Sequence, residues 1–253
     1  MQDLLREMHQ WMHDYMRSFY TDDEEVQKGI VLKEEHTGYV TSISKELAGH
    51  LGLSLEDRQL AEIIGLFHDV GRFRQFSVYR TFNDAKSEDH AALGLQVLEE
   101  LPFLKEMPKA SADIVRFAIL WHNKKEIQGA KSRRQLFFAK LIRDADKLDI
   151  YRVLRPFLTA PTDEGISRDF VTKFRNGEQV DYTKIRTQED RKLVRLMWVY
   201  DINFAWTLKK VAERGYVADI IKELPKDKDV EEGVRRLLAY VEKKCAQPDV
   251  AEL

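Results

Sequence analysis

The stretch AEIIGLFHDVGRFRQF, residues 61–76, runs apolar from Ile63 to Phe67 and then places His68 and Asp69 side by side. Such a run is typical of a buried helix. A buried helix rarely ends on two titratable groups without partners, because removing an unpaired polar group from water is costly. The side chains of His68 and Asp69 therefore need a partner elsewhere in the chain.

The composition fits a soluble globular protein. The chain has 253 residues, of which 43% are hydrophobic, so it can bury a large core. It holds 41 basic and 43 acidic residues for a net charge of −2, which gives no cationic field for a long nucleic acid. The single cysteine, Cys245, excludes a disulfide framework and a cysteine-based zinc site.

The N-terminus and the hydropathy pattern indicate a cytoplasmic protein. The first 20 residues, MQDLLREMHQWMHDYMRSFY, carry acids and histidines throughout, unlike the basic and apolar regions of a signal peptide. No apolar run approaches the roughly 20 residues that a membrane span needs. We therefore expect no membrane association.

Helical periodicity predicts an all-α fold. Helices are expected at 25–51, 54–69, 88–100, 109–123, 133–154, 188–213, 216–223 and 229–245. Residues 72–86 (RFRQFSVYRTFNDAK) show no clear period and are predicted as a long ordered loop. Residues 1–253 should form one all-helical domain, with a core at about 25–155 and a helical cover at about 156–253.

Capping residues and breakers set several of these expected boundaries. Ser54 suits a capping box at the start of its helix, and Ser87 is expected to cap the next one. Pro156 should end the helix before it. In the first of these helices an apolar face is predicted to contain Leu32, His36, Tyr39, Ile43 and Leu47.

Six ligand-type residues share faces with buried apolar residues. His36, His90, His122 and Asp146 follow apolar residues at helical spacings, as His68 and Asp69 do at the end of their helix. A lone histidine on an apolar face is most often a core residue bonded to a carbonyl group. Here five separate stripes must meet in one core, and a divalent cation would satisfy all six groups together.

The order of these residues resembles the HD-domain superfamily of metal-dependent phosphohydrolases, in the subgroup with two additional histidines. Four blocks within residues 30–150 carry the resemblance as a set: LFHDVGRF, DHAALG, WHN and RDADKLD. The resemblance implies an HD-domain helical bundle with the additional C-terminal helices packed on the core.

The resemblance also implies a two-metal site. The first ion would be held by His36, His68, Asp69 and Asp146. Asp69 would bridge to a second ion, which would also be held by His90 and His122. A thiolate-free donor set suits Mn²⁺, Fe²⁺, Co²⁺, Ni²⁺ or Zn²⁺, and the sequence does not choose among them.

The implied reaction is hydrolysis of a phosphoester, in a nucleotide or another phosphomonoester or diester, by a metal-bound hydroxide. Asp69 and Arg72 are the predicted catalytic residues, because the superfamily often has a phosphate-binding lysine at the place of Arg72. Gly71 is expected to leave room for the substrate. Predicted substrate-binding cations are Arg72, Arg74, Arg80, Lys86 and Lys147, although a solvated loop is the commoner setting for Arg74 and Arg80.

Two other functions stay open at this point. The same ligands resemble the di-iron centre of HD-fold oxygenases that cleave inositol or organophosphonates with O₂. A non-catalytic interaction protein could use the metal to hold its helices together. The segment RRLLAYVEKK, residues 235–244, is amphipathic and leaves a homodimer open, although packing against its own core is commoner.

Overall fold

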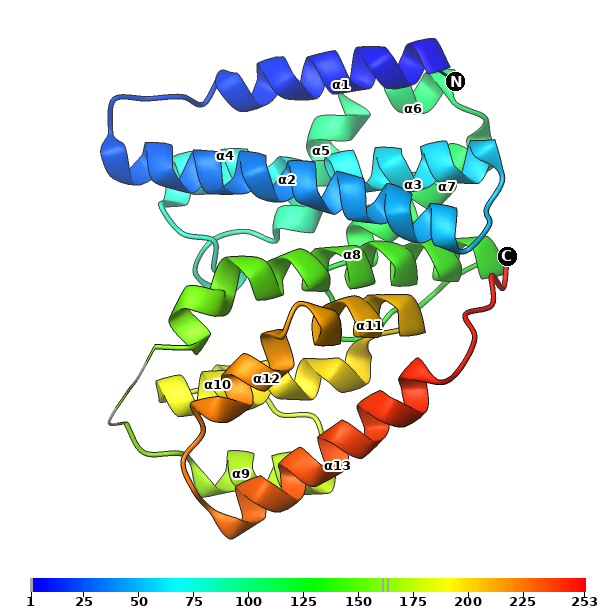
Figure 1. Ribbon diagram of the computed structural model, residues 1–253. Coiled ribbons are helices and arrows are strands. Elements are labelled where there is room, and N and C mark those ends of the chain that lie inside the picture. Colours follow the sequence, from blue (N-terminus) through cyan, green and yellow to red (C-terminus); the bar gives the residue numbers. More distant parts are fainter. Residues whose placement is uncertain (1, 161, 163) are drawn as a thin grey trace. The chain divides into compact units, whose positions relative to one another are not determined.

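Helices make up the regular secondary structure of the protein. The computed structural model describes residues 2–160, 162 and 164–253, and within these residues it contains helices and no strand (Figure 1). The predicted all-α fold is therefore confirmed. None of the described helices is long and apolar enough to cross a membrane.

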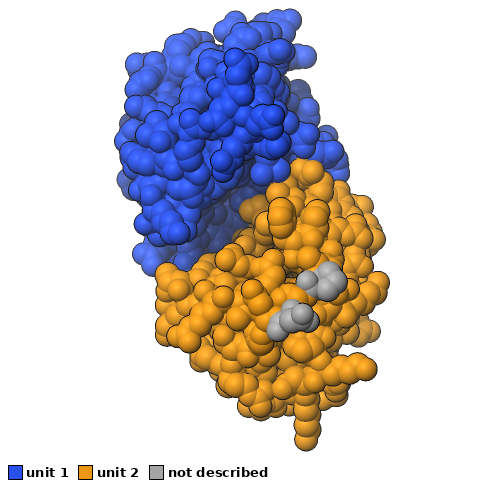
Figure 2. All heavy atoms as spheres, turned by 90° about the vertical axis from the view of Figure 1, so that its left-hand side faces the viewer, with its two compact units in different colours: residues 1–146, 250–253 blue, residues 147–249 orange. Residues whose placement is uncertain are grey.

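The chain divides into two compact units (Figure 2). Residues 1–146 and 250–253 form unit 1, and residues 147–249 form unit 2. The expected single domain, with residues 156–253 packed over the core, stays a prediction.

Unit 1 contains all six predicted ligand residues. Its elements are α1 (Gln2–Arg17), α2 (Glu24–His50), α3 (Leu55–Phe67), α4 (Val70–Tyr79), the 3₁₀ turn η1 (Asp84–Lys86), α5 (His90–Glu99), α6 (Phe103–Glu106), α7 (Lys109–Trp121) and the first half of α8 (Arg133–Leu158). Helix α2 packs against α3, and α4 packs against α5. These two helix pairs bring the ends of distant segments together.

Side-chain caps fix where these helices begin. The Ser54 hydroxyl accepts a hydrogen bond from the Asp57 backbone N–H at 3.1 Å, as the sequence predicted for the start of α3. Asp89, rather than Ser87, caps α5 by accepting from the Ala91 N–H at 3.0 Å. The first residue of α5 is therefore His90, which lies directly after its cap.

Unit 2 is helical as well. It contains α9 (Arg168–Asn176), η2 (Tyr182–Lys184), α10 (Gln188–Met197), η3 (Trp198–Asp201), α11 (Ala205–Glu213), α12 (Tyr216–Lys222) and α13 (Lys228–Cys245). Helix α13, red in Figure 1, packs against α9 and α11. A buried ion pair lies inside this unit, where Lys192 Nζ is 2.8 Å from Glu189 Oε1.

The predicted loop at residues 72–86 is wrong over its first half, because residues 70–79 form α4. The side chains of Val70, Phe73 and Phe76 are buried at spacings of three, but the polar Gln75 is buried beside them. That buried amide hides the helical period. Arg80 then ends the helix in the left-handed region, with φ 55°.

Two expected helix boundaries are also wrong. Helix α8 continues through Pro156 to Leu158, so the proline costs a hydrogen bond only in its last turn. The expected helix 188–213 is broken between η3 and α11. There the Asp249 carboxylate accepts hydrogen bonds from the N–H groups of Ala205 and Trp206, at 2.7 and 2.8 Å, and starts a new helix.

The predicted apolar face of α2 is only partly buried. His36, Ile43 and Leu47 are buried, whereas Leu32 is 37% exposed and Tyr39 is 50% exposed. Both exposed residues lie at the edge of the buried face of α2, so their side chains are only partly covered. Val40 lies on the buried face instead.

Candidate metal centre

The structure brings the six predicted ligand residues into one cluster. They come from five places in the fold: His36 from α2, His68 and Asp69 from the turn between α3 and α4, His90 from the start of α5, His122 from the end of α7 and Asp146 from α8. The four histidines and Asp69 are at most 5% exposed. Side chains of these types gather in a core only when they satisfy one another or a bound cation.

Asp69 lies between two pairs of histidines. Its Oδ2 atom is 3.5 Å from His36 Nε2 and 3.7 Å from His68 Nε2. Its Oδ1 atom is 3.3 Å from His90 Nε2 and 3.6 Å from His122 Nε2. One carboxylate thus presents one oxygen to each pair, which is the arrangement of a bridging ligand.

Asp146 adds a second carboxylate beside the pair formed by His36 and His68. Its Oδ1 atom is 3.1 Å from His36 Nε2 and 3.9 Å from His68 Nε2. The first half of the cluster therefore offers two nitrogens and two carboxylates. The second half offers two nitrogens and the other oxygen of Asp69.

Hydrogen bonds at Nδ1 determine which nitrogen of two histidines is free. His68 Nδ1 is 2.8 Å from the Gly65 carbonyl oxygen, and His122 Nδ1 is 2.7 Å from the Ile119 carbonyl oxygen. A carbonyl group can only accept, so both Nδ1 atoms carry the hydrogen. In the neutral ring the Nε2 atom then presents a lone pair to the cluster.

The Nε2 atoms of His90 and His122 present lone pairs to each other, which indicates a cation site. His90 Nε2 is 3.0 Å from His122 Nε2, and His68 Nε2 is 3.4 Å from His36 Nε2. His90 Nδ1 is 2.7 Å from Asp84 Oδ2, so the Nε2 atom of this ring also faces the cluster without a hydrogen. Imidazole and carboxylate donors converging in this way suit a divalent transition metal.

Burial keeps two of the predicted ligand histidines neutral. It lowers the pKa of His68 and of His90 to about 4, against 6.5 for an exposed histidine. Burial alone would raise the pKa of Asp69, but Lys33, Arg72 and the neighbouring histidines together outweigh it and hold that pKa well below its usual range. The pKa of Asp146 is likewise lowered, because its interactions with His36 and His68 together outweigh burial. Neutral imidazoles and ionised carboxylates are the forms that bind metals.

Two cations flank the Asp69 carboxylate. Lys33 Nζ is 2.6 Å from Asp69 Oδ2, and Arg72 Nε is 3.5 Å from Asp69 Oδ1. The buried Nε–H of Arg72 has no hydrogen-bond partner among the described residues. Sequence reasoning missed Lys33. The available signal was its position three residues before His36, which places both side chains on one face of α2.

The other predicted substrate-binding residues lie in different surroundings. Arg74 and Lys86 are exposed. Arg80 Nη1 is 2.9 Å from Asp23 Oδ2, and Lys147 Nζ is 2.8 Å from Asp201 Oδ2. Arg72 is thus the predicted cation that the structure brings to the cluster.

Gly71 does not leave room for a substrate, contrary to the expectation from sequence. A Cβ atom at this position would lie 2.3 Å from the His90 carbonyl oxygen and 2.5 Å from the Gly94 nitrogen. The space beside Gly71 is filled by the backbone of α5. This glycine allows α4 and α5 to approach closely enough to place Asp69 beside His90.

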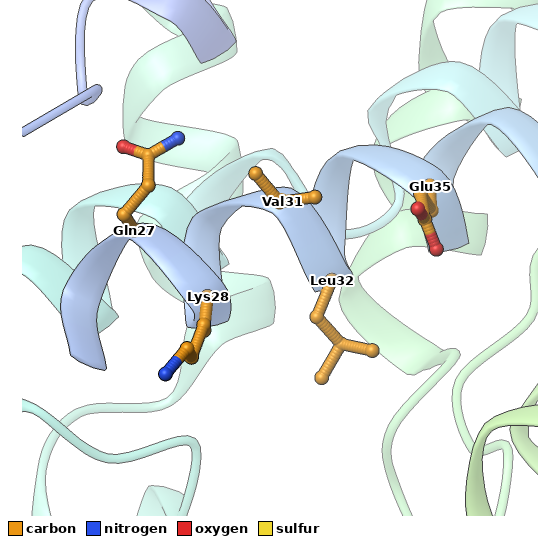
Figure 3. Close-up of a pocket in the computed structure, with 5 residues that line it drawn as sticks. All are labelled: Gln27, Lys28, Val31, Leu32 and Glu35. Atoms are coloured by element: carbon orange, nitrogen blue, oxygen red, sulfur yellow. The ribbon is translucent and has the colours of Figure 1, made fainter. Parts of the chain in front are cut away.

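A shallow pocket on α2 is lined by none of the predicted ligand residues. Figure 3 shows its five lining residues, Gln27, Lys28, Val31, Leu32 and Glu35, all from this helix. The exposed Leu32 side chain contributes to it. None of the five residues belongs to the histidine and aspartate cluster.

An all-helical fold and a cluster of four histidines and two aspartates are the features expected of an HD-type metal centre. The family model of the HD domain matches residues 34–151, so the chain carries an HD domain and the resemblance to that superfamily is confirmed. The HD domain is typical of metal-dependent hydrolases. No curated protein and no solved structure matches the chain in the corresponding comparisons.

Proposed function

We propose that the protein is a metal-dependent phosphohydrolase that uses two divalent ions. The observation that carries the proposal is the position of Asp69, whose two oxygens face two separate histidine pairs at 3.3–3.7 Å. The match to the HD domain also supports a metal-dependent hydrolase. The substrate class proposed is a small phosphate ester or nucleotide.

In the proposed reaction the protein would hold the metal-binding side chains in fixed positions. His36, His68, Asp69 and Asp146 would hold the first ion, and Asp69, His90 and His122 the second. When bound, two such ions lower the pKa of a water molecule and offset negative charge on a phosphoryl group. The backbone carbonyls of Gly65 and Ile119 keep two of the imidazoles oriented throughout.

Arg72 would stabilise the phosphoryl group. Its buried Nε atom is 3.5 Å from Asp69 Oδ1, and the Nε–H group has no hydrogen-bond partner among the described residues. This N–H group is therefore available as a donor to the substrate. Its Nη1 atom is held by Asp84 Oδ1 at 2.9 Å and by the Phe82 carbonyl oxygen at 2.7 Å. A donor fixed in this way needs no reorganisation as charge develops on the substrate.

The role of Arg72 is testable by substitution. We expect Arg72→Ala to lower turnover of an aryl phosphate by about 10²–10³-fold, the usual effect of removing one preorganised donor. Arg72→Lys should recover part of the loss, because the charge survives while the planar fork is lost. Full turnover in Arg72→Ala would contradict the assignment.

The reaction class is tested with metal-free protein reloaded with Mn²⁺ or Co²⁺ under anaerobic conditions. We expect hydrolysis of aryl phosphate monoesters or diesters, and its loss in His68→Ala. His13→Ala is the matched control, since His13 Nδ1 pairs with Asp14 on the exposed side of α1. Activity that requires iron and O₂ would instead identify an oxygenase, and metal binding without either activity would identify an interaction protein.

A further inference from the structure

We propose that Asp84 is a positioning residue that sets the affinity of the second metal site through His90. The proposal rests on the metal-dependent function proposed above. Asp84 lies in η1, outside the predicted ligand set, and its Oδ2 atom accepts a hydrogen bond from His90 Nδ1 at 2.7 Å. This bond places the lone pair of His90 Nε2 toward Asp69 Oδ1, 3.3 Å away.

His90 differs from His68 and His122 in the group that its Nδ1 atom contacts. His68 and His122 bond to backbone carbonyl oxygens of their own helices. A backbone carbonyl carries no net charge, whereas the Asp84 carboxylate carries a full one and makes the imidazole a stronger donor to a metal. The second site therefore has a charged partner at His90 Nδ1, where His68 in the first site has a backbone carbonyl.

Neighbouring side chains hold Asp84 in place. Its Oδ1 atom accepts hydrogen bonds from Arg72 Nη1 at 2.9 Å and from Gln75 Nε2 at 2.8 Å. Gln75 is fully buried, and its Oε1 atom accepts from the same Arg72 nitrogen at 2.8 Å. Arg72 Nε is also 3.5 Å from Asp69 Oδ1, so an ion pair links the Asp69 carboxylate to the residue that holds Asp84.

The network also explains why a glutamine is buried in α4. Besides Asp84, Gln75 Nε2 donates to Ser87 Oγ at 2.9 Å and to the Glu88 carbonyl oxygen at 2.7 Å. These bonds tie the segment before α5 to α4. A fixed segment keeps the Asp84 carboxylate at a constant distance from the imidazole of His90.

The acidic cluster of Asp84, Asp89 and His90 is not a third metal site. Asn123 Nδ2 donates to Asp84 Oδ2 at 3.2 Å and to Asp89 Oδ1 at 2.8 Å. Lys124 forms an ion pair with Asp89. Donor groups therefore already occupy the oxygens that a cation would need.

The test compares Asp84→Asn with Asp89→Asn in the full chain. Both remove one negative charge beside α5, but Asp89 caps that helix and has no described bond to His90, and asparagine retains capping ability. Metal-free proteins are titrated with Zn²⁺ by calorimetry, with elemental analysis of the saturated samples and urea unfolding of the metal-free samples.

We expect the wild type to bind two ions, and Asp89→Asn to bind two ions with the same affinities as the wild type. For Asp84→Asn we expect the first ion to bind unchanged and the second to bind about 10–100-fold more weakly. Equal binding by Asp84→Asn and the wild type would overturn this inference alone, as would equal weakening of both sites. A wild type that takes up no metal would overturn the proposed function and this inference with it.

A second measurement covers the case in which Asp84→Asn does not fold. Nitrogen-15 NMR of the histidines in the zinc-loaded wild type reports which ring nitrogen carries the hydrogen. We expect His90 to be protonated at Nδ1 and bound to zinc through Nε2. Zinc bound through Nδ1, or a hydrogen on Nε2, would overturn the inference.

Discussion

Replacing Gly71 by alanine should disturb the metal centre without touching a ligand. The added Cβ would lie 2.3 Å from the His90 carbonyl oxygen and 2.5 Å from the Gly94 nitrogen, whereas ordinary contacts begin at 3.4 Å. Both atoms belong to the backbone of α5, so no side-chain rotation relieves the overlap. Helices α4 and α5 must separate locally by about 1 Å.

This displacement should affect both stability and metal binding. Overpacking of a well-packed core costs about 1–3 kcal/mol, and we expect a loss of unfolding free energy near the upper end, about 3 kcal/mol. Because His90 is the first residue of α5, its imidazole should move away from Asp69 Oδ1. A misplacement of about 1 Å can lower turnover by about 10²-fold.

The assay combines urea unfolding of the metal-free protein with zinc titration. Gly38→Ala is the matched control, because Gly38 lies inside α2 and a Cβ there meets no atom within 4 Å. That variant should be more stable by about 0.5–1 kcal/mol. A Gly71→Ala protein with wild-type stability and two tightly bound ions would refute the reasoning.

Three further predictions follow from the cluster. Asp69→Ala should lose both ions in elemental analysis while His122→Ala keeps one, and equal loss from both variants would contradict the two-site assignment. Lys33→Gln should bind the first ion more tightly, because Lys33 no longer competes for Asp69 Oδ2, yet turn over an aryl phosphate about 10²-fold more slowly; unchanged affinity and rate would refute a role for this cation. Burial lowers the pKa of His68 and His90 to about 4, so the unfolded chain binds more protons between pH 4 and 6.5. The metal-free protein should therefore lose up to about 3 kcal/mol per histidine as the pH falls through that window, and constant unfolding free energy down to pH 4 would contradict this.

The cluster of ligand residues could be predicted because each residue extends an apolar stripe. A helix turns its residues by a constant angle, so the spacing from buried neighbours places His36, His90 and His122 inside the core. The adjacent pair His68 and Asp69 follows the end of α3, where the residues from Ile63 to Phe67 are all buried. Where five such stripes meet, their polar ends meet as well.

The supporting residues could not be predicted from spacing. Asp84 and Gln75 lie in a segment without a clear period, and their roles depend on hydrogen bonds to His90 and Arg72 that form only in the folded chain. Buried polar groups satisfied by such bonds look like surface residues in a sequence. The predicted loop at 72–86 was wrong for this reason.

Tertiary contacts also set boundaries that local signals do not contain. The break before α11 depends on Asp249, more than 40 residues further along the chain, which caps the backbone of Ala205 and Trp206. The role of Gly71 depends on the backbone of α5. In both cases the deciding atom belongs to a segment distant in sequence.

The most direct test of the two-ion centre is a crystal structure of the protein loaded with Mn²⁺ or Zn²⁺, with anomalous scattering to locate the ions. We expect two peaks on opposite sides of the Asp69 carboxylate. One should lie among His36, His68 and Asp146, and the other between His90 and His122. A single peak, no peak, or ions bound away from Asp69 would contradict the central claim that this carboxylate bridges two metals.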